Sequence, residues 1–235
     1  MIKEFTTKDL AFMVDHTQLA AYAGPVLFEK LCKEAVDYGF RMVAINSVQV
    51  EFCKNILKGT NVHVGAAIAF PLGQCTIKSK MFETEDAIKN GADEIDYVLN
   101  IPKLIAGEVD YIKSEMEGIV GLCRDANVIS KVIFENCYLT KEQIELAAKI
   151  AKDVHPDFIK TSTGFGTGGA TVEDVALMKK TVGSEVKVKA AGGVRTKEAF
   201  IAMIEAGAER IGTSSGVKII DSFENNSISI DLKYC

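Results

Sequence analysis

The strongest constraint on the fold of this chain is a repeat of short apolar runs separated by helix-like stretches. The runs with strand character are 13–17, 41–46, 63–70, 94–100, 130–136, 158–163, 185–191 and 210–214. The last seven begin 22 to 36 residues apart, which is the footprint of one strand with its crossover helix. The stretches between them carry apolar residues near i, i+3, i+4 and i+7, as in 26–39, 141–154 and 197–207. Strand and helix therefore alternate along the chain.

Eight such units predict a single closed (β/α)8 barrel, the TIM barrel. An open doubly wound sheet is the alternative, but no GxGxxG follows the first strand, and a length of 235 residues is close to the ~250 typical of the barrel. Only four prolines occur, and no Pro/Gly/Ser-rich linker divides the chain, which favours one domain over 1–235. The segment from about residue 220 onward is a short tail outside the repeat.

Composition narrows the class of protein. The chain is 48% hydrophobic and 25% charged, which is typical of a packed globular protein. A net charge of −5 argues against a general nucleic-acid binder, so an anionic ligand needs a local positive site. No apolar run of about eighteen residues predicts a membrane span. The first residues lack the apolar core of a secretory signal, and we expect a cytoplasmic protein.

The cysteines and histidines carry no metal or disulfide signature. The six cysteines have no CxxC spacing, which predicts reduced thiols and no zinc ribbon; they are Cys32, Cys53, Cys75, Cys123, Cys137 and Cys235. His16, His63 and His155 are scattered through the pattern. The sequence therefore predicts no metal site.

Alternation along each strand assigns side chains to the two faces of the barrel. In 94–100 the outward set, which must meet the helices, is Ile95, Tyr97 and Leu99. The valines Val186 and Val188 define the outward face of 185–191 in the same way. The polar and charged residues that this rule places inside are Asn46, Glu94, Asp96, Asn100, Lys131, Glu135, Lys160, Ser162, Lys187 and Lys189.

Interior lysines require a physical reason, because burying an unpaired charge costs several kcal/mol. One reason is a structural ion-pair network, with Glu94 beside Lys187 and Glu135 beside Lys131. The other is chemistry: Lys160 and Lys189 lie on neighbouring strands, and Asp96 lies at similar depth on a third.

A lysine that is partly desolvated and close to a second ammonium group has a lowered pKa, so more of it is the neutral amine that attacks carbonyl carbon. The resulting iminium is an electron sink that permits proton loss or cleavage of a carbon–carbon bond. Asp96 would then pair with the cation and move protons.

Small residues follow the last three strands. The segments are TSTGFGTGGA (161–170), AAGGVRT (190–196) and GTSSG (212–216). Glycines let backbone N–H groups approach an anion, and the loops after the last two strands are the usual phosphate position of this barrel. A phosphate site is therefore predicted here, with Ser214 and Ser215 beside it and Arg195 in a supporting role.

These motifs together resemble the 2-deoxyribose-5-phosphate aldolase family, class I aldolases with a (β/α)8 fold. The resemblance runs from about Asp15 to Gly216, through DHTQL (15–19), AFPLG (69–73), GADEIDYVLN (91–100), FIKTSTGF (158–165), VKAAGGVRT (188–196) and GTSSG (212–216). It implies reversible cleavage of 2-deoxy-D-ribose 5-phosphate to D-glyceraldehyde 3-phosphate and acetaldehyde, with no metal or organic cofactor.

The resemblance also implies site residues. Lys160 looks like the Schiff-base lysine, Lys189 like the second lysine that lowers its pKa, and Asp96 like the proton-shuttling carboxylate. The implied phosphate contacts are Gly164, Gly192, Gly193, Gly212, Ser214 and Ser215, with Arg195 nearby. Asp15, Asn46 and Lys131 are expected around the reacting groups.

The chain departs from the family pattern at four positions. Ala44 and Ser47 replace a cysteine and a proline in VAINS (43–47). Asn136 stands where threonine is more frequent, and Phe165 where some members have lysine. These departures bear on the pocket wall and on substrate affinity.

Two other functions remain open at this stage. One is a Schiff-base aldolase or transaldolase acting on another phosphorylated aldehyde. The other is a non-catalytic phosphosugar-binding barrel in which Lys160 and Lys189 only pair with acids. A homodimer is expected by analogy with barrels of this family.

Overall fold

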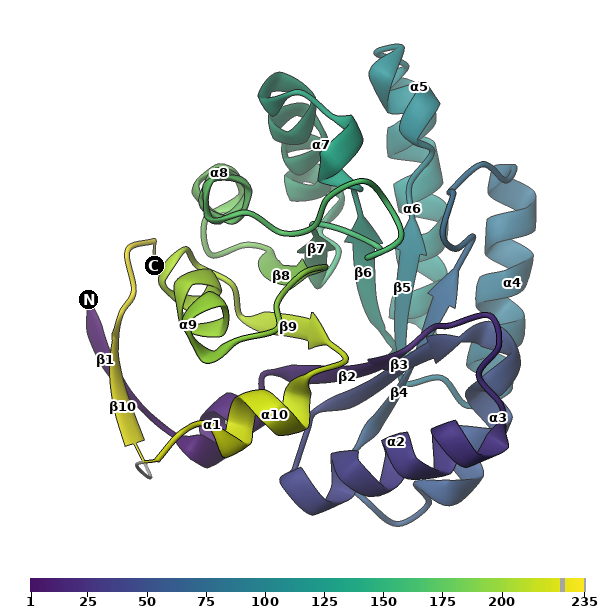
Figure 1. The fold of residues 1–235 in the computed structure, drawn as a ribbon. Coiled ribbons are helices and arrows are strands. Elements are labelled where there is room, and N and C mark those ends of the chain that lie inside the picture. The colour runs from purple at the N-terminus through teal and green to yellow at the C-terminus, as the bar shows by residue number, and fades with distance from the viewer. Residues whose placement is uncertain (225–226, 235) are drawn as a thin grey trace.

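The computed structural model describes residues 1–224 and 227–234. Within them, eight parallel strands close into a barrel in the order β2-β3-β4-β5-β6-β7-β8-β9 (Figure 1). These strands are β2 Val14–Gln18, β3 Met42–Asn46, β4 His63–Ile68, β5 Glu94–Val98, β6 Ile129–Ile133, β7 Phe158–Lys160, β8 Lys187–Ala191 and β9 Arg210–Thr213. Each strand overlaps one of the eight predicted runs, with β2 and β6 each extending one residue beyond its run, and the predicted TIM barrel is confirmed.

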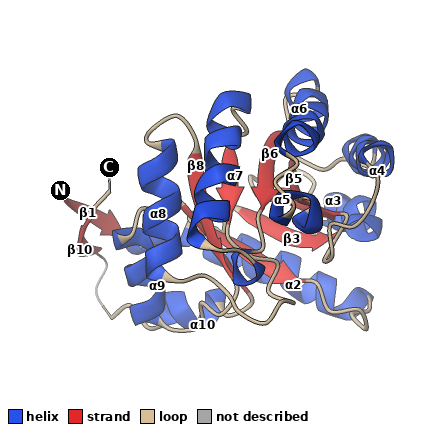
Figure 2. Ribbon diagram, turned by 90° about the horizontal axis from the view of Figure 1, so that it is seen from above, coloured by secondary structure: helices blue, strands red, loops and turns tan. Residues whose placement is uncertain are grey.

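Helices surround the barrel (Figure 2). They are α1 Thr7–Ala11, α2 Pro25–Tyr38, α3 Val50–Ile56, α4 Ile77–Lys89, α5 Ile101–Ile105, α6 Val109–Asp125, α7 Lys141–Val154, α8 Val172–Val182, α9 Lys197–Glu205 and α10 Gly216–Asp221, with short 3-10 turns η1 Ser47–Gln49 and η2 Asn136–Tyr138. Thr140 and Gln143 form a capping box that starts α7. The described helices include none long and apolar enough to cross a membrane.

The strand register brings the interior charges together. Asp96 of β5 is the direct neighbour of Lys131 in β6, and Lys160 of β7 is the neighbour of Lys189 in β8. All four side chains are buried, while Ile95, Tyr97 and Val188 pack outward in the hydrophobic core. The predicted interior placement of these four residues is confirmed.

Lys187 is not buried in the barrel, in contrast to the prediction from alternation. It begins β8 and is exposed, with its Nζ 5.6 Å from the centre of the Phe158 ring. Alternation gives the face of a side chain but not its depth, and a residue at the first position of a strand reaches solvent at the end of the barrel.

The two structural ion pairs considered from the sequence are also wrong. Glu94 pairs with Lys131 at 2.5 Å rather than with Lys187. Glu135 accepts hydrogen bonds from Thr163 rather than pairing with Lys131. Depth explains both corrections, since Lys131 lies level with Glu94 and Asp96, whereas Glu135 lies beyond the end of β6.

A two-stranded ribbon outside the barrel was not predicted. β1 Ile2–Thr6 and β10 Ser227–Asp231 pair antiparallel, so the tail packs against the first residues of the chain (Figure 1). Phe5 and Ile230 are buried, which explains why the ribbon is held against the barrel. Beyond it, the Tyr234 carbonyl lies close to Gly207, in the turn before β9. Cys235 lies outside the described residues.

We expect Ile230→Ala to lower the free energy of unfolding by about 2–5 kcal/mol, because it removes most of a buried side chain. The exposed neighbour offers a control, since Ser229→Ala should change it by no more than about 0.5 kcal/mol. Urea-induced unfolding measures both. Equal midpoints for the two variants would show that the ribbon does not belong to the cooperative unit.

Candidate active site

A pocket of about 460 Å³ opens at the carboxyl ends of the barrel strands. Its wall comes from the loops after β2, β7, β8 and β9, and none of its described lining residues carries a carboxylate. The lining residues are Thr17, Gln18, Leu19, Ala20, Ala21, Tyr22, Lys160, Thr163, Gly164, Phe165, Ala191, Gly192, Gly193, Val194, Arg195, Gly212, Thr213 and Ser214. Lys160 and Arg195 supply its positive charge, so the pocket suits an anionic ligand.

Lys160 connects this pocket to the barrel interior. It is the last residue of β7 and is 4% exposed. Burial lowers its pKa to about 8, and the ammonium groups of Lys189 and Lys131 act in the same direction, while Asp96 opposes them. At neutral pH roughly a tenth of such a lysine is the neutral amine, several hundred times more than for an ordinary lysine. The geometry thus supplies a nucleophilic amine at the pocket.

Asp96 is shared by three lysines. Its Oδ2 accepts hydrogen bonds from Lys160 at 2.8 Å and from Lys189 at 2.6 Å, and its Oδ1 accepts one from Lys131 at 2.7 Å. Burial alone would raise the pKa of this carboxyl, but the three ammonium groups together hold it well below its ordinary value. Asp96 is therefore a carboxylate at any physiological pH.

The ion pairs continue deeper into the barrel. Asp15 contacts Lys189 at 2.5 Å and Arg210 at 2.6 Å. Glu94 contacts Lys131 at 2.5 Å and Arg210 at 3.3 Å. Burial alone would raise the pKa of Glu94, but Lys131 and Arg210 hold this pKa below its ordinary value.

Three buried carboxylates, Asp15, Glu94 and Asp96, thus contact four buried cationic groups, Lys131, Lys160, Lys189 and Arg210. Of these four cations, Lys160 alone lines the pocket. Lys160 is therefore the member of this network that a ligand can reach.

Arg210 is a site component that sequence reasoning missed. It is 6% exposed and bridges Asp15 and Glu94. Strand alternation could have identified it: Ile211 faces outward in β9, so its neighbour Arg210 faces the barrel interior, as Lys160 does in β7.

The three residues expected around the reacting groups fall into two groups. Asp15 and Lys131 belong to the buried network and contact Lys189 and Asp96. Asn46 supports the pocket wall instead, since its Nδ2 donates to the Leu19 carbonyl at 3.3 Å.

Most of the predicted phosphate contacts line the pocket. Gly164, Gly192 and Gly193 have φ of 88°, 84° and 79°, a backbone region that favours glycine. Gly212, Ser214 and Arg195 join them. Ser215 is not among the lining residues, and its N–H donates to Thr213 Oγ1 at 2.9 Å.

The loops after β7 and β8 touch through their main chains. A Cβ on Gly169 would lie 2.2 Å from the Gly192 carbonyl oxygen, so any side chain there forces the loops apart. The Ala170 N–H donates to the carbonyls of Ala191 and Gly192, at 3.0 Å each. The two loops are therefore one rigid wall.

Glu135 holds the other side of the β7 loop, a role not predicted. Its backbone is left-handed, with φ of 60°, and its carboxyl accepts from the Thr163 N–H at 3.1 Å and from the Thr163 hydroxyl. Thr163 Oγ1 in turn accepts from the Phe165 N–H at 3.0 Å. These bonds fix the chain that follows Lys160.

The four departures from the family pattern have structural counterparts. Ala44 and Asn136 are buried. The Ser47 hydroxyl donates to Glu83 at 2.9 Å. Phe165 lines the pocket and meets Phe70 edge to face, with ring centres 5.3 Å apart, so an aromatic pair stands where some family members carry a cation.

Among the described residues, no three His, Cys, Asp or Glu side chains form a cluster that could hold a metal ion. The absence of a metal or organic cofactor stays a prediction.

We expect the pKa of Lys160 to respond with opposite signs to two substitutions. Asp96→Asn removes a negative charge that favours the ammonium form, so the pKa should fall further below about 8. Lys189→Met removes a positive charge that disfavours it, so the pKa should rise by about one unit or more. The pH dependence of Lys160 modification by an amine-reactive reagent, read by peptide mass spectrometry, measures both. Shifts of the same sign would refute the electrostatic account.

Gly169→Ala should loosen both loops of the rigid wall. We expect backbone amides in 161–170 and 190–196 to exchange hydrogen roughly tenfold faster, because the added Cβ breaks the Gly169–Gly192 contact. Hydrogen exchange with mass spectrometry measures this, and Gly121→Ala, whose Cβ meets nothing within 4 Å, is the control. Faster exchange in 161–170 alone would mean that the loops move independently.

Comparison with known proteins gives one consistent result. Residues 10–221 match the DeoC/LacD family of aldolases. The chain is 60% identical to the deoxyribose-phosphate aldolase of Lactobacillus acidophilus, over 94% of this chain and 93% of that protein. It is 51% identical to the deoxyribose-phosphate aldolase of Bacteroides thetaiotaomicron, over 95% and 94% of the two chains.

A solved structure agrees with these relatives. The deoxyribose phosphate aldolase of Aeropyrum pernix, described as a tetramer, superposes with a TM-score of 0.87 at 30% identity and covers 94% of this chain and 93% of its own.

Proposed function

The chain belongs to the DeoC/LacD aldolase family, and on that premise we propose that it is a deoxyribose-phosphate aldolase. The reaction is the reversible cleavage of 2-deoxy-D-ribose 5-phosphate to D-glyceraldehyde 3-phosphate and acetaldehyde. One observation carries the assignment of the chemistry: a buried lysine with its pKa lowered to about 8 meets a glycine-lined pocket at the carboxyl ends of the strands.

Lys160 is the nucleophile of the proposed mechanism. Its neutral Nζ adds to the aldehyde carbon of the open-chain sugar, and the carbinolamine loses water to give an iminium. The hydroxyl on C3 then loses its proton, the C2–C3 bond breaks, and its electron pair moves toward the iminium nitrogen to form an enamine. Glyceraldehyde 3-phosphate leaves as an aldehyde. Protonation of the enamine carbon and addition of water release acetaldehyde and restore Lys160.

Asp96 and Lys189 handle charge and protons in this scheme. The carboxylate of Asp96, 2.8 Å from Lys160 Nζ, stabilises the iminium by direct ion pairing. Because its pKa is held well below the ordinary value, Asp96 carries a proton only transiently. In this scheme Asp96 accepts the proton of the C3 hydroxyl and returns it to the enamine carbon, while the ammonium group of Lys189, 2.6 Å from the same oxygen, stabilises the carboxylate form.

The phosphate end of the substrate would meet the glycine loops. Gly164, Gly192, Gly193 and Gly212 present main chain to the pocket, and the Arg195 guanidinium adds a positive charge at its rim. This orientation directs the aldehyde carbon toward Lys160. A cytoplasmic location and a homodimer are part of the proposal.

Trapping with acetaldehyde and sodium borohydride tests the proposed chemistry. We expect a reduced ethyl adduct on Lys160, located by peptide mapping, and no adduct in Lys160→Leu. That variant should retain its circular dichroism spectrum and lose turnover by at least about 10³-fold, the cost of removing a covalent nucleophile. An adduct spread over surface lysines, or none, would favour the non-catalytic phosphosugar-binding barrel.

Substrate identity is tested separately by product analysis. Release of acetaldehyde from 2-deoxyribose 5-phosphate supports the proposal. A lysine adduct without that release would favour a Schiff-base aldolase or transaldolase for another phosphorylated aldehyde.

A further inference from the structure

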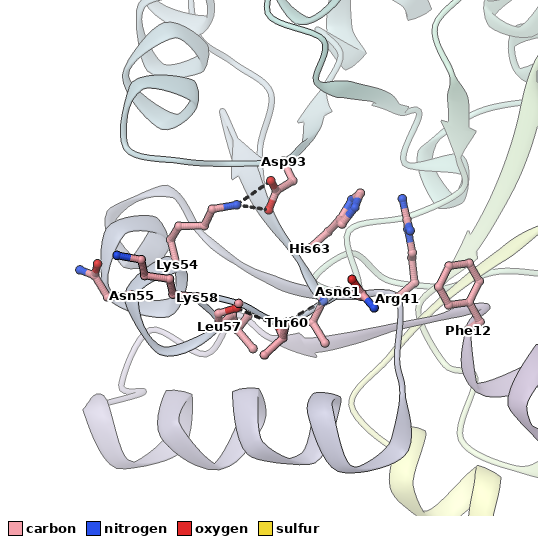
Figure 3. A pocket seen from close by; sticks show the side chains of 12 residues that line it. Phe12, Arg41, Lys54, Asn55, Leu57, Lys58, Thr60, Asn61, His63 and Asp93 are labelled. Atoms are coloured by element: carbon pink, nitrogen blue, oxygen red, sulfur yellow. Dashed lines mark hydrogen bonds and ion pairs between the residues drawn. The ribbon is translucent and has the colours of Figure 1, made fainter.

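A second pocket lies at the opposite end of the barrel from Lys160. Figure 3 shows the side chains that line it. Arg41 directly precedes β3, His63 begins β4, and Asp93 directly precedes β5, so the pocket opens at the amino ends of the strands. Its volume is about 720 Å³. We call it the basal pocket, and its lining residues are Phe12, Arg41, Lys54, Asn55, Leu57, Lys58, Gly59, Thr60, Asn61, Val62, His63 and Asp93.

The basal pocket has an excess of positive charge in a chain whose net charge is −5. Asp93 is the one carboxylate among the described lining residues, and its two oxygens accept from Lys54 Nζ at 2.6 and 2.7 Å. One of them also accepts the Val64 N–H at 2.9 Å. Asp93 is thus occupied by Lys54 and the backbone, which leaves Arg41, Lys58 and His63 to meet a ligand.

Arg41 is held in place by the Phe12 ring and by an ion pair with Glu94. Its guanidinium lies 5.0 Å from the centre of the Phe12 ring, and its Nε is 3.7 Å from Glu94 Oε1, beyond hydrogen-bond distance. Glu94 already pairs with Lys131 and Arg210. The guanidinium N–H groups of Arg41 therefore remain as donors, and 23% of its side chain is exposed.

His63 contacts the same carboxylate oxygen, Glu94 Oε1, as Arg41. Its Nδ1 is 2.8 Å from Glu94 Oε1, and 27% of its side chain is exposed. The bond to Glu94 fixes the ring, so Nε2 lies at its other edge and donates to an anion when the ring is protonated. Arg41 and His63 thus form a pair of donors, and the buried carboxylate of Glu94 holds both in position.

We propose that the basal pocket binds a small phosphorylated molecule, with its phosphate against Arg41 and His63 and its polar body toward Thr60 and Asn61. A phosphomonoester matches this site better than a monocarboxylate, because Arg41 and His63 lie next to each other and a phosphate group has more oxygens for their donors; Lys58, on the far side of the pocket, adds positive charge to the lining (Figure 3). The guanidinium fork binds phosphate oxygens in a bidentate manner. The proposal makes no use of Lys160 and does not depend on the proposed aldolase activity.

Nuclear magnetic resonance of the histidine rings tests the proposal at the site itself. The chain has three histidines, so the ring signal of His63 can be assigned by comparison with His63→Gln. Inorganic phosphate is the probe, added at constant pH and with sodium chloride adjusted to hold ionic strength. We expect a saturable shift of the His63 signal, and a midpoint roughly tenfold higher in Arg41→Gln.

Two further variants test whether phosphate acts on His63 from the basal pocket rather than from the protein surface or from the pocket of Lys160. Lys33→Gln removes an exposed lysine of α2 that pairs with Asp37, and it should leave the His63 midpoint unchanged. Ser214→Glu places a carboxylate in the pocket of Lys160, and it should also leave the midpoint unchanged. Circular dichroism verifies that each variant is folded.

Three results would overturn the proposal. They are a His63 shift that grows linearly without saturation, a midpoint that Arg41→Gln leaves unaltered, and loss of the shift in Ser214→Glu. The last would mean that phosphate acts on His63 from the other end of the barrel.

Discussion

The barrel interior depends on one carboxylate that three lysines share. Asp96 contacts Lys131, Lys160 and Lys189 at 2.6 to 2.8 Å, and without it the three buried ammonium groups would lose the carboxylate that they share. Parallel strand register produces the arrangement, because Asp96 and Lys131 are neighbours on β5 and β6. The same register that closes the barrel therefore determines the electrostatics of its reactive lysine.

The burial of Lys160 beside two other lysines gives this interior its chemical character. Here burial and the remaining cations favour the neutral amine at Lys160, which is also the position that ends its strand and lines the pocket. The contacts of Asp96 with the three lysines therefore contribute both to folding stability and to the reactivity of Lys160, and a substitution at Asp96 disturbs both.

Much of this could be predicted from residue patterns, and the failures share physical causes. Spacing gave the barrel, and alternation gave the interior face of Lys160 and Asp96, because both rules describe single elements. Lys187 was placed wrongly because alternation contains no information on depth. The β1–β10 ribbon joins segments more than 200 residues apart in the sequence, and local patterns do not identify such a partner. Glu135 acts from a left-handed residue after its strand, where strand alternation no longer applies.

The contact between Gly169 and Gly192 limits which substitutions the two loops can accept during evolution. Because the two main chains leave no space for a side chain, a substitution at either glycine would displace the other loop. We therefore expect glycine to be retained at both positions. New specificity would then arise at positions that line the pocket without touching this contact, such as Phe165 and Tyr22.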